Sequence, residues 1–312
     1  SLGSRRLISA RVGIKHAVET ALVMCGGASF LRRTHSEHLL VLAYHNIAPN
    51  GMDVVGDRSL HLRQSVFASQ LDALTRTHDI VALGEAISEI PASQSRPRAA
   101  ITFDDAYSGA MTAGVEELRA RQLPATVFIT PSFLDGRAFW WDTLADPRRG
   151  LDARIRERAL SEGRGLNVEV LALAAEMGLP TYDMPLHARG ASTEQLNAAL
   201  QYDRITFAAH TWSHPNLVSL PNAELAEELQ RTRTWLQCFG DRALPMVSYP
   251  YGLADRRVQN AAHQAGYTAG FMIDGGWTVA APSDRFAIPR LNVPAGVSTN
   301  GFILRTSGLV QG

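Results

Sequence analysis

The stretch that most constrains the fold is residues 99–107, which has the sequence AAITFDDAY. Its small and β-branched residues predict a short buried strand, and residues 107–122 predict the helix that follows it. Two adjacent carboxylates, Asp104 and Asp105, therefore stand at the end of an inner strand, where an unpaired charge is costly to bury. A helix N-cap accounts for only one of them. Because ligands bind at such strand ends in α/β folds, and successive strand side chains point opposite ways, we expect different roles for the two residues.

A second group of polar residues follows another expected strand. After the apolar run 205–209 come His210 and His214, whose spacing lets both imidazoles point the same way. Together with Asp105 they form a ligand set typical of a catalytic divalent metal that keeps one position open for water. A His-x-x-x-His spacing is weak evidence alone, and its value here depends on the Asp pair that precedes it in the chain.

Both stretches resemble motifs of the polysaccharide deacetylase family, also called the NodB-homology domain. Residues 102–105 (TFDD) match the first motif and residues 210–217 (HTWSHPNL) match the second. With the flanking strands, the resemblance covers about residues 38–295. It implies that the three ligands named above hold one divalent metal ion, for which we expect zinc. It also implies that Asp104 is the general base, the role that remains for the first carboxylate once the second binds the metal.

Other positions depart from the family's usual pattern. Ser248 stands where the third motif usually has an arginine, two residues before a Pro-Tyr-Gly turn. By resemblance, the backbone N–H of Tyr251 in that turn helps to hold the oxyanion. The last expected strand, residues 286–293, lacks the histidine that usually acts as the acid. Ala106 replaces the usual glycine after the Asp pair, and it would be strained if that position requires a positive φ.

We assign the two missing functions to His45 and Arg290. Of the remaining histidines, only His45 closes a buried strand (residues 39–45), and a parallel barrel would bring it to the same rim as Asp104. An ordinary histidine pKa of about 6.5 suits an acid that works near neutrality. The alternative is a structural histidine bonded to a backbone carbonyl. Arg290 would supply the charge that orients Asp104. This arrangement resembles the branch of the family that deacetylates exopolysaccharides, in which the motif order is permuted.

Strands and helices alternate along the chain, and the residues suited to chemistry follow strands. This pattern indicates an α/β barrel of parallel strands, and the resemblance sharpens it to an irregular (β/α) barrel of NodB type. Residues 135–204 break the alternation and predict an inserted helical segment, in which Trp140 and Trp141 would either stack on sugar rings or anchor the insertion to the core. We expect three parts: an N-terminal helical segment (1–36), the deacetylase barrel with its insertion (37–305), and a C-terminal tail (306–312).

The composition limits the classes of partner and the compartments that we expect for this protein. Basic and acidic residues both number 30, so no bulk charge attracts nucleic acid. Two cysteines leave the compartment open. Residues 5–33 are basic with a short apolar run, too short for a membrane span and without a clean cleavage site. We expect an amphipathic helix on the domain or on a membrane surface, and hence a cytoplasmic or membrane-peripheral protein.

Three functions remain open. The favoured one is a metal-dependent hydrolase that removes N-acetyl groups from amino sugars of a cell-envelope or exported polysaccharide. The same site could instead serve a metal-dependent amidohydrolase acting on a small non-sugar amide or imide. The third is an inactive carbohydrate-binding relative, a hypothesis motivated by Ala106 and Ser248. The sequence defines neither the sugar, nor the chain length, nor the oligomeric state.

Overall fold

The computed structural model describes residues 19–20, 38–88, 96–279 and 282–308. Most of the expected N-terminal helical segment and the end of the expected tail lie outside these residues, so their conformation stays a prediction, as does any contact with a membrane surface. None of the helices that the structure describes is long and apolar enough to cross a membrane.

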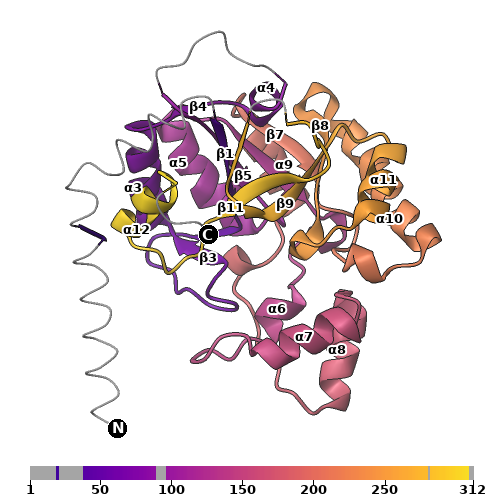
Figure 1. Ribbon diagram of the computed structural model, residues 1–312. Coiled ribbons are helices and arrows are strands. Elements are labelled where there is room, and N and C mark those ends of the chain that lie inside the picture. The colour runs from indigo at the N-terminus through magenta and orange to yellow at the C-terminus, as the bar shows by residue number, and fades with distance from the viewer. Residues whose placement is uncertain (1–18, 21–37, 89–95, 280–281, 309–312) are drawn as a thin grey trace.

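The centre of the molecule is a closed barrel of seven parallel strands surrounded by helices, which confirms the expected fold class (Figure 1). Around the barrel they are β1 (His38–Tyr44), β5 (Arg98–Phe103), β6 (Ala125–Ile129), β7 (Ile205–Ala209), β8 (Ala243–Ser248), β9 (Ala269–Gly275) and β11 (Ile288–Asn292). Four short strands lie outside this ring: β2 (Asn46–Ala48), β3 (His61–Arg63), β4 (Asp79–Ile80) and β10 (Trp277–Val279). Of these, β10 runs antiparallel to β1 and β4 extends the sheet beside β5.

Strand β1 closes the barrel and places the first site residue. Its residues from Leu39 to Tyr44 are buried without alternation, as expected for a strand covered on both faces. It pairs in register with β5 on one side and with β11 on the other. The backbone N–H of Asp104 donates to the carbonyl of Tyr44 at 2.9 Å, so His45 and Asp104 leave their strands at the same rim.

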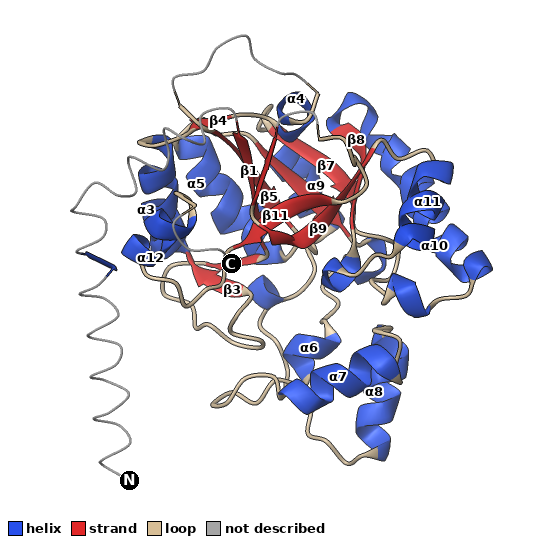
Figure 2. Cartoon of the chain, in the orientation of Figure 1, coloured by secondary structure: helices blue, strands red, loops and turns tan. Residues whose placement is uncertain are grey.

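Helices pack around the outside of the barrel (Figure 2). They are α3 (Gln64–Thr75), α4 (Leu83–Ala86), α5 (Val115–Ala120), α9 (Thr193–Leu200), α10 (Asn222–Leu236), α11 (Arg256–Gln264) and α12 (Thr299–Arg305). Local signals start several of them: Ser192 and Gln195 form a capping box at α9, and Asp255 caps α11. The helix expected over residues 107–122 starts at Ser108 and passes through a π-helical turn, η1 (Ala110–Gly114), before it continues as α5.

Part of the expected insertion forms a lobe at the rim of the barrel (Figure 1). This helical lobe consists of α6 (Trp140–Thr143), α7 (Ala153–Ser161) and α8 (Asn167–Glu176). The later helix α9 lies instead against the barrel beside β7 and η1. Short 3₁₀ turns complete the described chain: η2 (Pro131–Phe133), η3 (Leu186–Ala188), η4 (Leu217–Ser219), η5 (Gln237–Arg242) and η6 (Pro250–Gly252).

Candidate active site

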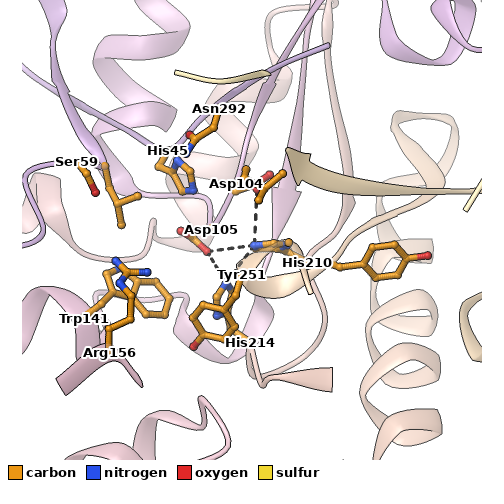
Figure 3. A pocket seen from close by; sticks show the side chains of 14 residues that line it. His45, Ser59, Asp104, Asp105, Trp141, Arg156, His210, His214, Tyr251 and Asn292 are labelled. Atoms are coloured by element: carbon orange, nitrogen blue, oxygen red, sulfur yellow. Dashed lines mark hydrogen bonds and ion pairs between the residues drawn. The ribbon is translucent and has the colours of Figure 1, made fainter. Parts of the chain in front are cut away.

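The carboxyl ends of the barrel strands and the helical lobe enclose a cavity of about 290 Å³ (Figure 3). Six of the seven site residues expected from the sequence line it: His45, Asp104, Asp105, His210, His214 and Tyr251. The seventh, Arg290, is fully buried behind Asp104. The structure therefore brings together all seven residues, both those in the recognised motifs and the two that were assigned to replace missing ones.

The expected metal ligands lie at the floor of this cavity. The Oδ1 atom of Asp105 lies 3.5 Å from Nε2 of His210 and 3.3 Å from Nε2 of His214. The two Nε2 atoms are 3.1 Å apart, and all three residues are buried. Nδ1 of His210 donates to the carbonyl of Ser248 at 2.8 Å, because a carbonyl can only accept. That bond fixes the tautomer and leaves the Nε2 lone pair of His210 pointing at Asp105.

This group has the donor set of a cation site. Burial raises the pKa of Asp105, and the nearby carboxylates of Asp104 and Asp142 raise it further. Burial lowers the pKa of His214, with His210 adding to the effect. Among the described residues, Asp105 Oδ1 has no hydrogen-bond donor. One carboxylate and two neutral imidazoles, whose ligand atoms lie within 4.8 Å of one another, fit a divalent metal ion.

Beside this group, Asp104 is held by a guanidinium from β11. Nη1 of Arg290 donates to Oδ1 of Asp104 at 2.8 Å, and Nη2 donates to Oδ2 at 2.7 Å. The other donors of Arg290 reach Thr102 (Oγ1), Ser248 (Oγ) and Met272 (carbonyl oxygen), so each of the five guanidinium N–H groups has an acceptor. The expected contact between Arg290 and Asp104 is present. Ser248, which departs from the family's motif, accepts a hydrogen bond from the arginine that replaces the usual one.

This pairing sets the charge of Asp104. Burial by itself raises the pKa of a carboxyl, but the charge of Arg290 and its hydrogen bonds outweigh burial and hold the pKa of Asp104 well below its usual range. Asp104 is therefore ionised at neutral pH. Its Oδ2 lies 3.9 Å from Nε2 of His210, at the edge of the metal group.

His45 lines the cavity from the end of β1, as expected, but its pKa differs from the expected value. Burial lowers the pKa of His45 to about 4, and the opposing effect of Asp104 is smaller. The expected value differs because the sequence does not show how far other segments of the chain cover the His45 ring. Within the part of the chain that the structure describes, the His45 ring has no hydrogen bond of the kind that the structural-histidine alternative requires.

Backbone strain is concentrated around the site. Among the described residues, eight other than glycine have a positive φ, and five of them belong to the motifs: Asp105, Ala106, Thr211, His214 and Tyr251. Ala106 has a φ of 56°, so the position where the family usually has glycine does require a left-handed conformation. Strained backbone of this kind persists where the surrounding structure holds it, and it is typical of functional sites.

The comparisons with known proteins agree with this geometry. The sequence profile of the polysaccharide deacetylase family matches residues 92–270, more than half of the chain. The chain belongs to the polysaccharide deacetylase family. No curated protein sequence matches it.

Solved structures of deacetylases share the fold. PplD of Streptococcus pyogenes, in complex with acetate, has 16% identity and a TM-score of 0.58, with 86% of this chain and 98% of that chain covered. IcaB from Ammonifex degensii has 17% identity and a TM-score of 0.59, with 87% and 97% covered. The BpsB deacetylase domain from Bordetella bronchiseptica has 16% identity and a TM-score of 0.54, with 83% and 96% covered. At these identities, the likeness concerns the fold.

Tyr251 joins the deacetylase barrel to the helical lobe. Its hydroxyl donates to the carbonyl of Gly165 and accepts from Nε1 of Trp140, both at 3.0 Å. The two segments approach so closely that a Cβ on Gly165 would lie 2.7 Å from the Tyr251 ring. The phenol is thus committed to structure, which leaves the backbone N–H as the group of Tyr251 available for the role implied by the resemblance. Trp140 is fully buried, in keeping with an anchor.

Sequence reasoning missed a hydrogen-bond network at the roof of the cavity. Its centre is Asp142, which is fully buried. Oδ1 of Asp142 accepts from Nε2 of His61 and from the backbone N–H of Asp57, both at 2.8 Å, and Oδ2 accepts from the Tyr107 hydroxyl at 2.7 Å. Trp141 donates to the same hydroxyl, and its ring lies 4.7 Å from that of His214. A carboxylate directly after three aromatic residues was the signal that could have identified this network.

Proposed function

We propose that this chain is a metal-dependent hydrolase that removes N-acetyl groups from amino sugars of a cell-envelope or exported polysaccharide. The observation that carries the proposal is the meeting of a metal-type ligand group and an ionised carboxylate in one cavity, with Asp104 Oδ2 3.9 Å from His210 Nε2. Membership of the polysaccharide deacetylase family supports the type of reaction and the glycan substrate.

The residues divide the work of amide hydrolysis among them. A divalent ion held by Asp105, His210 and His214, with zinc as the expected ion, would lower the pKa of a water molecule and polarise the acetamido carbonyl. Asp104, kept ionised and oriented by Arg290, accepts the proton of the attacking water. As the C–N bond breaks, acetate leaves and the amine nitrogen of the sugar takes up a proton.

Two further groups complete the proposed mechanism. The backbone N–H of Tyr251, in the left-handed turn η6, donates to the oxyanion of the tetrahedral intermediate. His45 donates the proton to the leaving amine. Because burial lowers its pKa to about 4, His45 is neutral before substrate binds. It acts as the acid by taking up, once the oxyanion has formed, the proton that Asp104 accepted from the water, since a nearby negative charge raises the pKa of an imidazole.

The two departures that motivated an inactive relative are compatible with activity. Ser248 hydrogen-bonds the substitute arginine, and Ala106 adopts the left-handed conformation that the turn requires. An inactive protein would need some other defect. The small-amide hypothesis differs from the proposed function only in substrate and is separated from it by the assay below.

The test is acetate release from N-acetylglucosamine oligomers, with small cyclic amides as the competing substrates. Wild-type protein with added zinc should release acetate from the oligomers and lose this activity with a chelator. Asp104→Asn should bind the same amount of metal and lose about 10²–10⁴-fold in kcat, the usual contribution of a general base. Turnover of the cyclic amides alone would reject the glycan substrate. Near-normal turnover by Asp104→Asn would reject the assigned base.

A further inference from the structure

A second guanidinium lies at the cavity, on the side formed by the helical lobe. Arg156 of α7 lines the wall beside Trp141, with its guanidinium turned toward the cavity (Figure 3). One of its nitrogens, Nη2, forms an ion pair with Oδ2 of Asp57. Asp57 is itself buried, and its Oδ1 accepts from the hydroxyl of Ser59 at 2.7 Å and from the backbone N–H of Ser59 at 3.2 Å. Arg156 is therefore held in place by a fixed partner.

The two guanidiniums at the cavity differ in the donors they leave over. Every N–H of Arg290 has an acceptor, as described above. Among the described residues, the guanidinium of Arg156 makes no hydrogen bond except the one to Asp57, and the side chain is 42% exposed. Its remaining N–H donors are thus available to a ligand in the cavity. A guanidinium presents these donors in a planar fork that matches a carboxylate or a phosphate.

Two other arginines lie close in sequence to Asp57, the partner of Arg156. Residues 57–61 contribute to the catalytic cavity through Ser59 and Leu60, and to a second, open cavity of about 660 Å³ through Arg58 and His61. Arg58 and Arg63, both exposed, line this second cavity, where Asp53 is the acidic residue facing them. A glycan chain that extends from the catalytic cavity across this loop would meet a row of three arginines.

We propose that the site is built for an acidic glycan, in which a sugar next to the N-acetylated one carries an anionic group that Arg156 binds. The shared chemistry is an oxyanion, either the carboxylate of a uronic acid or a phosphate. This inference rests on the proposed function and names the substrate class for the same cavity. Arg156 is then a specificity-determining residue, and the chemistry at the acetamido group stays with the residues on the floor.

The test compares three N-acetylated tetrasaccharides: neutral N-acetylglucosamine, N-acetylglucosamine alternating with glucuronate, and N-acetylglucosamine with a phosphate on the neighbouring sugar. The ratio of kcat/KM for an acidic over the neutral substrate should fall about 10–100-fold in Arg156→Gln, through KM, because hydrogen bonds between charged groups are worth roughly this factor. Arg156→Lys should keep part of the preference, since it keeps the charge and loses the fork. The comparison between the two acidic substrates identifies which oxyanion is recognised.

The matched control is Arg154→Gln, an exposed arginine on the same helix, which should leave the ratio unchanged. Calorimetric binding of the same tetrasaccharides to wild type and Arg156→Gln separates this inference from the proposed function. Acid-selective binding that depends on Arg156, without acetate release, would reject the deacetylase and keep the acidic ligand. Equal binding of neutral and acidic tetrasaccharides by wild type, or an equal loss of both in Arg156→Gln, would overturn the inference.

Discussion

Two buried carboxylates are held in opposite ways: Asp104, which lines the cavity, and Asp142, which directly follows the lining residue Trp141. On the floor, Asp104 is paired with the full positive charge of Arg290. On the roof, Asp142 accepts from a phenol, an imidazole N–H and a backbone N–H. His61 can donate through Nε2 because the side-chain amide of Asn46 donates to its Nδ1.

The difference indicates two purposes for a buried charge. The guanidinium of Arg290 keeps Asp104 ionised beside the metal-type ligand group. The position of Asp104 is fixed separately, by the end of β5. The donors around Asp142 come from two segments, residues 57–61 and the turn after the Asp pair, and the carboxylate joins both to its own helix, α6. The pairing with Arg290 therefore sets the charge of Asp104, whereas the hydrogen bonds to Asp142 hold segments of the chain together.

The largest effect should follow from removing the charge on the floor. Arg290→Met leaves Asp104 buried and unpaired, and the free energy of unfolding in urea should fall by about 3–5 kcal/mol. The double variant Arg290→Met with Asp104→Asn removes the orphaned charge and should recover part of that loss. Equal losses in the single and double variants would mean that the ion pair is not what stabilises the floor.

Metal binding should have the next largest effect on the unfolding free energy, and this effect should depend only on the ligands at the floor of the cavity. Zinc at 100 times its Kd should raise the unfolding free energy by about 2.7 kcal/mol by mass action. His210→Ala and His214→Ala should abolish this gain and the bound metal, whereas His263→Ala, an exposed histidine on α11, should change neither. Unchanged metal stoichiometry in both ligand variants would refute the site.

Substitution of Asp142 on the roof should reduce the unfolding free energy less than substitution on the floor, because the donors to Asp142 are neutral. Asp142→Asn keeps the shape but weakens the three hydrogen bonds, and we expect a loss of about 1–3 kcal/mol in unfolding free energy. Hydrogen exchange should increase in residues 57–61, while the affinity for metal stays the same. A loss of metal affinity without a change in exchange would show that Asp142 acts on the floor and would erase the distinction between the two carboxylates.

The smallest effect concerns the strained turn beneath the cavity. Ala106→Gly relieves a left-handed alanine, which offsets the extra entropy of glycine in the unfolded chain, so stability should stay equal or rise by up to about 1 kcal/mol. The same substitution at Ala175, exposed in α8, should cost about 0.5–1 kcal/mol. If both variants lose the same stability, the turn at Ala106 is not strained.

The floor could be predicted from the sequence because its residues directly follow strands. Asp104 and Asp105 directly follow β5, His210 follows β7, and the parallel barrel brings these strand ends to one rim. Arg290 was predicted by asking which residue could replace a missing charge. Strands β4 and β10 were not predicted, since two or three residues are too few for a periodicity to be seen.

The hydrogen-bond network of the roof could not be predicted, because the local sequence around each of its residues gives no sign of a distant partner. His61 and Asp142 are 81 residues apart, and neither occurs in a recognisable motif. The pKa of His45 was out of reach for a related reason: it depends on how completely other segments cover the ring. In this molecule, local sequence patterns identify the reactive residues, whereas long-range packing determines their pKa values and hydrogen-bond partners.

The pairing of Asp104 with Arg290 also has a consequence for how the chain is made. The partners are 186 residues apart, and β11, which carries Arg290, inserts between β1 and β9 to close the barrel. While the ribosome is still producing the intervening residues, Asp104 has no counter-charge and must stay in contact with water. Closure of the barrel and neutralisation of this carboxylate therefore occur in the same step, so that a nascent chain has no assembled active site until β11 has emerged.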